Sequence, residues 1–243
     1  MILFPAIDIL DGRAVRLVQG RFEDRTVYAD DPLEAALQWV QDGARWLHVV
    51  DLDGARAGEP VNLEHLRRIA REAGVPVQAG GGLRTKRATD DALAAGAARV
   101  VVGTAAFRDP AMLEATVAAH GDRVAVGVDV RGGEVAAAGW TQSTQQSPED
   151  AIARLRDQGV ATIVYTNVDR DGMLEGPDLD EMARIASLSD LELIWSGGIA
   201  RAEDLHALAQ AAATSPTLAG VIVGKALYER RFTVAEAIAA LGG

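Results

Sequence analysis

The sequence of 243 residues contains no cysteine, so disulfide bonds, thiolate metal sites and cysteine nucleophiles are excluded. It also lacks a long apolar run: no stretch approaches the ~18 residues that a membrane span needs. The opening Met1-Ile2-Leu3-Phe4-Pro5 is too short for a signal peptide. These absences lead us to expect a cytoplasmic protein without membrane contact.

Positive charge is scarce, because 24 basic residues stand against 35 acidic ones and leave a net charge of −11. The basic residues are scattered among acids, so we expect no nucleic-acid surface. A phosphorylated metabolite remains compatible, since backbone amides and a few cationic side chains can hold it. No cluster of histidine, aspartate and glutamate has metal-ligand spacing, and no Walker or GxGxxG pattern occurs.

Short β-branched runs alternate with longer amphipathic stretches rich in alanine and leucine, which indicates parallel strands joined by helices. Eight such units without a linker predict one closed (β/α)₈ barrel spanning residues 1–243; the alternative is an open doubly wound sheet. The expected strands are Ile2–Ile7, Trp46–Val50, Val75–Gln78, Val100–Val102, Val124–Val128, Thr162–Tyr165, Leu191–Trp195 and Gly220–Val223. Helices are expected at, among others, Pro32–Gln41, Asn62–Ala73, Thr85–Ala95, Pro148–Gln158 and Ala202–Ala213.

An internal repeat strengthens the barrel interpretation. Five short features recur in the same order after about 120 residues, close to half the chain. We therefore expect two (βα)₄ half-barrels, at about residues 1–122 and 123–243. The paired features are Ile7-Asp8 with Val128-Asp129, Asp51-Leu52-Asp53-Gly54 with Asp169-Arg170-Asp171-Gly172, Gly58 with Gly176, Gly81-Gly82 with Gly197-Gly198, and Gly103-Thr104 with Gly224-Lys225.

The repeated glycines follow strands three, four, seven and eight, where the active site of this fold lies. Glycine lets a backbone approach a ligand closely, and the helix N-termini that follow direct amides toward an anion. Glycine at such turns is often only structural, but two related pairs favour a small molecule with a phosphate at each end. The predicted phosphate-binding residues are Gly81, Gly82, Gly103, Thr104, Gly172, Gly176, Gly197, Gly198, Gly224 and Lys225.

Aspartates end two strands that lie opposite each other in an eight-stranded barrel. Asp8 follows strand one and Asp129 follows strand five. Two carboxylates on either side of a substrate suit proton removal and proton donation, although a lone aspartate there is more often a turn or cap residue. Asp171 is a third candidate, and its counterpart Asp53 a weaker one.

Three larger side chains are less decisive. Arg16 and Arg84 could contact phosphate or could be solvated surface residues. Trp140 could stack on a flat ring or could pack inside the protein. The segments Gly20–Asp30 and Gly139–Ser147 are candidate lids over the site.

These residues carry a resemblance that covers essentially the whole chain. The sequence resembles the isomerases of histidine biosynthesis that convert an aldose to a ketose. The motifs that carry it are Phe4-Pro5-Ala6-Ile7-Asp8, Arg16-Leu17-Val18-Gln19-Gly20, His48-Val49-Val50-Asp51-Leu52-Asp53, Gly80-Gly81-Gly82-Leu83-Arg84, Val128-Asp129, Gly139-Trp140, Asp171-Gly172 and Ser196-Gly197-Gly198-Ile199.

The resemblance implies an Amadori rearrangement of N′-(5′-phosphoribosylformimino)-5-aminoimidazole-4-carboxamide ribonucleotide, a substrate with two phosphates. It implies that Asp8 accepts the C2′ proton and Asp129 donates one, with Asp171 sharing or owning the acid role. No metal or organic cofactor is expected from it. The oligomeric state is open, but two halves that complete one barrel make a monomer sufficient.

Three alternatives remain. The tail and the Arg16–Gly20 segment resemble the actinobacterial dual-substrate isomerase, which also acts on phosphoribosyl anthranilate in tryptophan synthesis, but Ala138 stands where that enzyme has an arginine for the anthranilate carboxylate. The cyclase subunit of imidazole glycerol phosphate synthase typically has a cysteine just before its first catalytic aspartate, where this chain has Ala6-Ile7. A non-catalytic phosphate-binding barrel is disfavoured because both Asp8 and Asp129 are retained.

Overall fold

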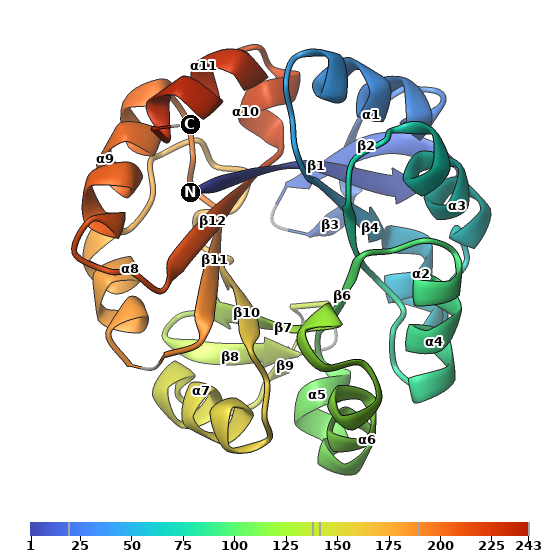
Figure 1. Ribbon diagram of the computed structural model, residues 1–243, viewed down its shortest axis with the longest axis vertical. Helices are drawn as coiled ribbons and strands as arrows, with labels where there is room; N and C mark the ends of the chain where they lie inside the picture. Colours follow the sequence, from blue (N-terminus) through green and yellow to red (C-terminus); the bar gives the residue numbers. More distant parts are fainter. Residues whose placement is uncertain (19, 138, 141, 189, 243) are drawn as a thin grey trace.

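In a computed structural model, which describes residues 1–18, 20–137, 139–140, 142–188 and 190–242, eight parallel strands form a closed ring (Figure 1). Their order is β1-β4-β5-β6-β7-β10-β11-β12, and β12 pairs with β1 to close the ring. The β6–β7 and β12–β1 pairings join the two predicted halves. This closure confirms the (β/α)₈ barrel and excludes the open sheet. The barrel strands are β1 (Ile2–Leu10), β4 (Leu47–Asp51), β5 (Val77–Gly80), β6 (Arg99–Val102), β7 (Val124–Arg131), β10 (Thr162–Asn167), β11 (Glu192–Ser196) and β12 (Leu218–Val223).

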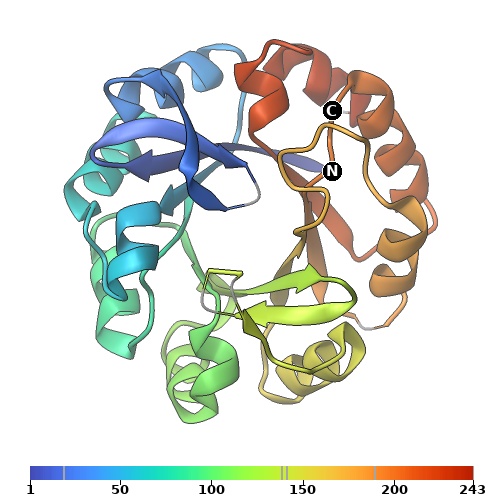
Figure 2. The same cartoon turned by 180° about the vertical axis from the view of Figure 1, so that it is seen from behind.

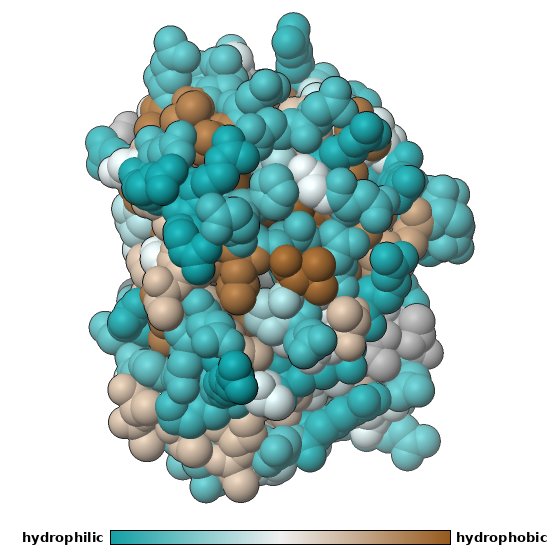
Figure 3. All heavy atoms as spheres, turned by 90° about the vertical axis from the view of Figure 1, so that its right-hand side faces the viewer, coloured by the Kyte–Doolittle hydropathy of each residue, from teal (hydrophilic) through white to brown (hydrophobic). Residues whose placement is uncertain are grey.

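Helices surround the ring on its outside (Figures 1 and 2). None of those in the described ranges is long and apolar enough to cross a bilayer. The surface in Figure 3 is mostly hydrophilic, with scattered apolar residues. The helices are α1 (Pro32–Gln41), α2 (Leu52–Ala57), α3 (Leu63–Glu72), α4 (Lys86–Ala94), α5 (Ala105–Arg108), α6 (Pro110–His120), α7 (Pro148–Asp157), α8 (Leu179–Ala186), α9 (Ala202–Ala212), α10 (Lys225–Tyr228) and α11 (Val234–Ala240), with a 3₁₀ turn at Gly121–Arg123.

Local sequence explains where the helices begin. Proline occupies the first helical turn of α1, α6 and α7, where its missing N–H has no helical partner to lose. Asp31, Asp109 and Ser147 precede these prolines, and each side chain accepts a hydrogen bond from a backbone N–H of the first turn. All five helices named from the sequence are present, with ends that agree within one residue.

In the described residues the buried apolar side chains form two main cores, and Leu10, Val15 and Leu17 form a third, smaller cluster. A large core packs the outer faces of the strands against the helices, with Ile7, Val126 and Trp195 fully buried in it. A smaller core inside the barrel contains residues from alternate positions, as the two-residue period of a strand requires. Its members are Phe4, Ala6, Ala125, Val164, Ile194 and Ile222. Asp8 and Asp129 follow Ala6 and Ala125 in the same alternation, so they reach the mouth of the barrel.

Two β-hairpins were not predicted as strands. β2 (Arg13–Val18) pairs with β1 and with β3 (Arg21–Ala29), while β8 (Glu134–Ala137) pairs with β7 and with β9 (Gln142–Ser143). These hairpins contain most of the two segments expected as lids. Both lie on the face of the ring that is turned toward the viewer in Figure 2.

The duplicated glycines pack against backbone in the same way in both halves. Gly81 and Gly197 both have positive φ, and an added Cβ would lie 2.1 Å from the Asp51 carbonyl oxygen and 2.7 Å from that of Asn167, respectively. Glycine is therefore required here by a close approach of two loops, whatever ligand binds. These positions therefore need glycine for a structural reason that does not depend on phosphate binding.

We predict that Gly81→Ala destabilises the protein by at least about 2 kcal/mol more than Gly74→Ala. Gly74 also has positive φ, but an added Cβ there meets no atom within 4 Å, so it isolates the backbone strain from the collision. Urea unfolding of both variants measures the difference. Equal losses would show that the loop contact at Gly81 is not tight.

Candidate active site

Asp8 and Asp129 lie on opposite strands at one end of the barrel. Their strands, β1 and β7, are four places apart in the ring of eight, and Asp171 follows the end of β10. Each of the three carboxyl groups is largely buried, and the charge of Asp171 raises the pKa of both Asp8 and Asp129. The structure thus brings together the three aspartates that the sequence singled out.

Arg16 joins two of these carboxylates. It is on β2, which pairs with β1 so that Val15 lies beside Asp8. Its Nη1 donates to Asp8 Oδ2 at 2.8 Å, and its Nη2 lies 3.9 Å from Asp171 Oδ1. The Arg16 side chain is only 11% exposed, so this is a buried ion-pair network and not a solvated arginine.

Burial dominates the charge state of the site. It raises the pKa of Asp8 to about 6, against the lowering effect of Arg16. The pKa of Asp171 is also raised by burial, while Arg16 and Lys225 oppose the rise. Carboxyl groups whose pKa is raised by burial are common in proton-transfer sites.

Asp129 is held by two donors from different elements. Burial raises the pKa of Asp129, and hydrogen bonds from the Trp140 and Thr166 side chains lower it. Trp140 has φ of 69°, and its ring lies against Gly20, where an added Cβ would be 2.7 Å from Trp140 Cε3. The turn of the β2–β3 hairpin therefore touches the loop between β8 and β9, next to Asp129.

Thr166 is a site residue that the sequence did not reveal. Its neighbour in register on β7 is Asp129, and it is 7% exposed. By strand register its counterpart in the first half is Val50, which pairs with Asp8 as Thr166 pairs with Asp129, and the two residue types differ. The only available signal was its position near the end of a predicted strand.

The glycines after β10, β11 and β12 form one rim of the barrel mouth, and Arg16 and Lys225 contact two of them. These glycines are Gly172, Gly176, Gly197, Gly198 and Gly224. The Arg16 guanidinium packs on Gly224, since an added Cβ there would lie 2.5 Å from Arg16 Cζ. Lys225 Nζ donates to the Gly172 carbonyl oxygen at 2.8 Å. Gly176 N–H donates to the Gly198 carbonyl oxygen at 2.9 Å, which fixes the loop after β10 on the loop after β11.

The opposite rim is built by Gly81, Gly82, Gly103 and Thr104. Gly82 packs on the backbone of Gly54 and Glu59, whereas Gly103 is open, with no atom within 4 Å of an added Cβ. The exposed Arg84 donates through Nη2 to the Ala55 carbonyl oxygen at 2.8 Å and covers Gly58. In this arrangement Arg84 supports helix α2 and its C-terminal cap at Gly58.

The aspartates of the two repeated segments, Asp51–Gly54 and Asp169–Gly172, have different partners. Asp51 accepts hydrogen bonds from the backbone N–H groups of Gly54, Val61 and Asn62, and Asp53 accepts from Asp11 N and Asn62 Nδ2. Asp53 is thus fixed as a loop brace, while its counterpart Asp171 faces Arg16. Asp169, the counterpart of Asp51, accepts from Gly132 N.

His48 lies in the barrel interior below the mouth. Gln78 Oε1 accepts from Arg99 Nε at 2.7 Å, so its amide nitrogen donates to His48 Nδ1 at 2.9 Å. Burial, together with the nearby charges of Arg16 and Arg99, lowers the pKa of His48 to about 3. His48 is therefore neutral and satisfied, as expected for a barrel residue.

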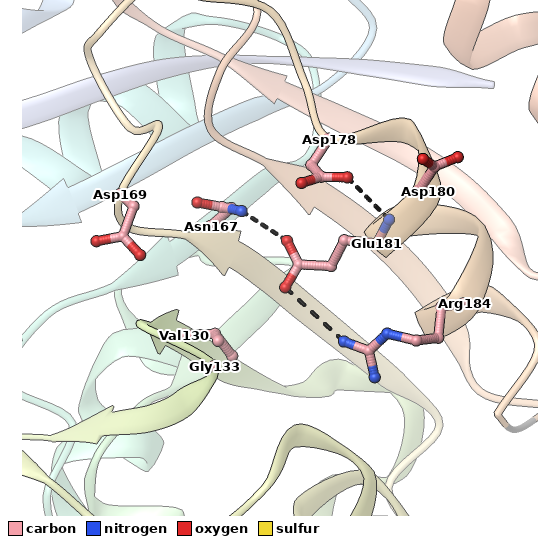
Figure 4. Close-up of a pocket in the computed structure, with 8 residues that line it drawn as sticks. All are labelled: Val130, Gly133, Asn167, Asp169, Asp178, Asp180, Glu181 and Arg184. Carbon is pink, nitrogen blue, oxygen red and sulfur yellow. Dashed lines mark hydrogen bonds and ion pairs between the residues drawn. The ribbon is translucent and has the colours of Figure 1, made fainter.

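An acidic cavity of about 500 Å³ lies outside the barrel mouth, beside α8 (Figure 4). Glu181, which lines this cavity, accepts hydrogen bonds from Tyr165 Oη and Asn167 Nδ2, so both of its carboxylate oxygens already have partners within the protein. The carboxylates of Asp169, Asp178 and Asp180 make it unsuitable for an anion. Among the described residues no group of three or more potential ligands could hold a metal ion.

Comparison with known proteins places this site in a family. Residues 2–233 match the family described as "Histidine biosynthesis protein". A protein of Desulfitobacterium hafniense strain Y51 named 1-(5-phosphoribosyl)-5-((5-phosphoribosylamino)methylideneamino) imidazole-4-carboxamide isomerase is 45% identical over 242 residues, covering 100% of this chain and 98% of that protein. Proteins with the same name from Moorella thermoacetica and Rhodospirillum rubrum are both 46% identical, covering 98% and 99% of each chain. With the match spanning nearly every residue, the chain belongs to the histidine biosynthesis protein family.

Proposed function

We propose that this chain is an aldose–ketose isomerase that converts N′-(5′-phosphoribosylformimino)-5-aminoimidazole-4-carboxamide ribonucleotide to its phosphoribulosyl form. The observation that carries the proposal is the opposed, buried pair Asp8 and Asp129 at one barrel mouth. The names of the related proteins from Desulfitobacterium hafniense, Moorella thermoacetica and Rhodospirillum rubrum support the same substrate.

Asp8 serves as the base in this mechanism. An acid first helps to open the ribose ring to a Schiff base, which makes the C2′ proton acidic. Asp8, with a pKa of about 6, is mostly ionised at neutral pH and takes that proton. The resulting enolamine takes a proton at C1′ and loses one from the 2′ hydroxyl, which gives the ketose.

Asp129 serves as the acid, and Asp171 is the alternative. Burial raises the pKa of both groups, so each holds a proton at higher pH than a solvated aspartate does. Trp140 and Thr166 orient Asp129, whereas Asp171 shares Arg16 with Asp8. The rearrangement only moves protons between carbon, nitrogen and oxygen, so these side chains suffice for it without a metal or organic cofactor.

The two rims bind the two phosphates. On one side Gly197, Gly198, Gly224 and Lys225 take one phosphate, with Arg16 adjacent to Gly224. On the other side Gly81, Gly82, Gly103 and Thr104 take the second. Helices α5 and α10 begin beside Gly103 and Gly224, and their first-turn amides add donors to each site.

We further propose that the enzyme is a monomer of the cytoplasm that binds neither nucleic acid nor membrane. One chain closes the barrel by itself, and both rims and all three aspartates come from that chain. The net charge of −11 opposes association with nucleic acid.

Asp8→Asn should keep substrate binding but lower kcat by about 10²–10⁴-fold, because the amide cannot accept the C2′ proton. Turnover of the aldose substrate is followed spectroscopically, and binding is measured by calorimetry with the ketose product. Turnover near the wild-type rate would show that Asp8 is not the base.

The value of kcat/KM should fall as the pH drops through about 6, because protonated Asp8 cannot act as a base. Since Arg16 lowers the pKa of Asp8, Arg16→Gln should move this acidic limb to higher pH. Arg13→Gln is the matched control, because Arg13 is on the same strand but pairs with the exposed Asp30 at 3.3 Å. A limb that stays in place in Arg16→Gln would refute the assignment.

The kcat/KM for phosphoribosyl anthranilate should be at least about 30-fold lower than that for the histidine-pathway aldose substrate. The reason is that no arginine occupies position 138 to pair with the anthranilate carboxylate. Ala138 lies outside the described residues, so this prediction rests on the sequence. Assays of both substrates with wild type and Ala138→Arg measure it. Comparable efficiency of the wild type on the two substrates would defeat it.

A further inference from the structure

We propose that Arg131 is a positioning residue that clamps the Trp140 backbone and so keeps the indole on the Asp129 carboxylate. The proposal rests on the acid role of Asp129 in the proposed function. It assigns a task to an arginine at the end of β7 that the sequence did not single out.

Arg131 reaches across its own hairpin. It is paired with Glu134 at the start of β8, and its exposed guanidinium donates through Nη1 to the Trp140 carbonyl oxygen at 2.8 Å. The hydrogen bond is to the backbone, so it acts on the conformation of the Trp140 peptide and not on the indole directly.

Trp140 needs such support because its φ of 69° lies in the left-handed region. A bulky side chain rarely adopts this conformation unless its surroundings hold it there. Three contacts do so: the Arg131 guanidinium on the carbonyl, Gly20 beneath the ring, and Asp129 at the indole N–H. Of these, the Asp129 contact is part of the proposed active site, whereas the exposed Arg131 guanidinium is not.

The clamp has a consequence for Asp129 that a merely structural contact would not have. The indole hydrogen bond lowers the pKa of Asp129. If the Trp140 backbone relaxes toward an ordinary φ, the indole leaves and the pKa of Asp129 rises. Because Asp129 must be protonated to act as the acid, the alkaline limb of the kcat profile then moves to higher pH.

The test compares five variants of the full chain on the aldose substrate, the fifth being Asp129→Asn. Arg131→Ala should lower kcat/KM by about fivefold, the value of one ordinary hydrogen bond, and should raise the alkaline limb. Trp140→Phe should raise the same limb, and Arg131→Lys should restore both readouts toward wild type. Arg108→Ala is the control, since exposed Arg108 donates to Gln142 Oε1 of the same hairpin at 2.8 Å and should change neither readout.

Each outcome decides the proposal. It is overturned if Arg131→Ala behaves like Arg108→Ala, or if it loses activity while the alkaline limb stays in place. Equal melting temperatures of the two variants exclude a general loss of stability. Asp129→Asn separates this proposal from the proposed function. If that variant turns over normally, the acid role is wrong and the clamp falls with it; if it is inactive and Arg131→Ala is silent, only the clamp fails.

Discussion

The site depends on one buried guanidinium. Arg16 lies between Asp8 and Asp171, at 2.8 Å from one and 3.9 Å from the other. Carboxylates gathered in a desolvated mouth repel one another and would all tend to take protons, and a single buried cation allows one of them to remain ionised. In the proposed mechanism Arg16 therefore favours the ionised form of Asp8 as proton acceptor, while burial favours the protonated form of Asp129 as the acid.

The same guanidinium ties chemistry to chain topology. Because Arg16 comes from the β2–β3 hairpin, the electrostatics of Asp8 are linked to the position of that hairpin, and its turn at Gly20 also supports Trp140. Asp129 is likewise tied to the β8–β9 hairpin through Trp140. The pKa of each of these carboxyl groups therefore depends on the position of one hairpin, so a movement of either hairpin would change the protonation of the site.

The sequence predicted the barrel and most of the candidate site because both depend on local rules. Alternating strand and helix patterns and prolines in first helical turns located the elements, and the repeat placed Asp8 and Asp129 on opposite strands. The hairpins were missed because their residues, as in the exposed Arg21–Ala29, lack the apolar alternation of a buried strand. The repeat misled about Asp53, since only the fold shows that Asn62 and Asp11 engage it. Thr166 and the strained φ of Trp140 depend on tertiary contacts that no local pattern encodes.

The two rims are built alike, whereas the aspartates between them have different surroundings. Gly81 and Gly197 approach the preceding loops in the same manner, whereas Asp53 and Asp171 do not share a role. The central claim is that two equivalent rims suspend a doubly anionic sugar between two unequal carboxylates. A crystal structure with the ketose product bound tests it most directly. It should show one phosphate at Gly81–Thr104 and the other at Gly197–Lys225, with the ribulose carbons between Asp8 and Asp129; a product held at one rim alone, or lying away from either carboxylate, would contradict it.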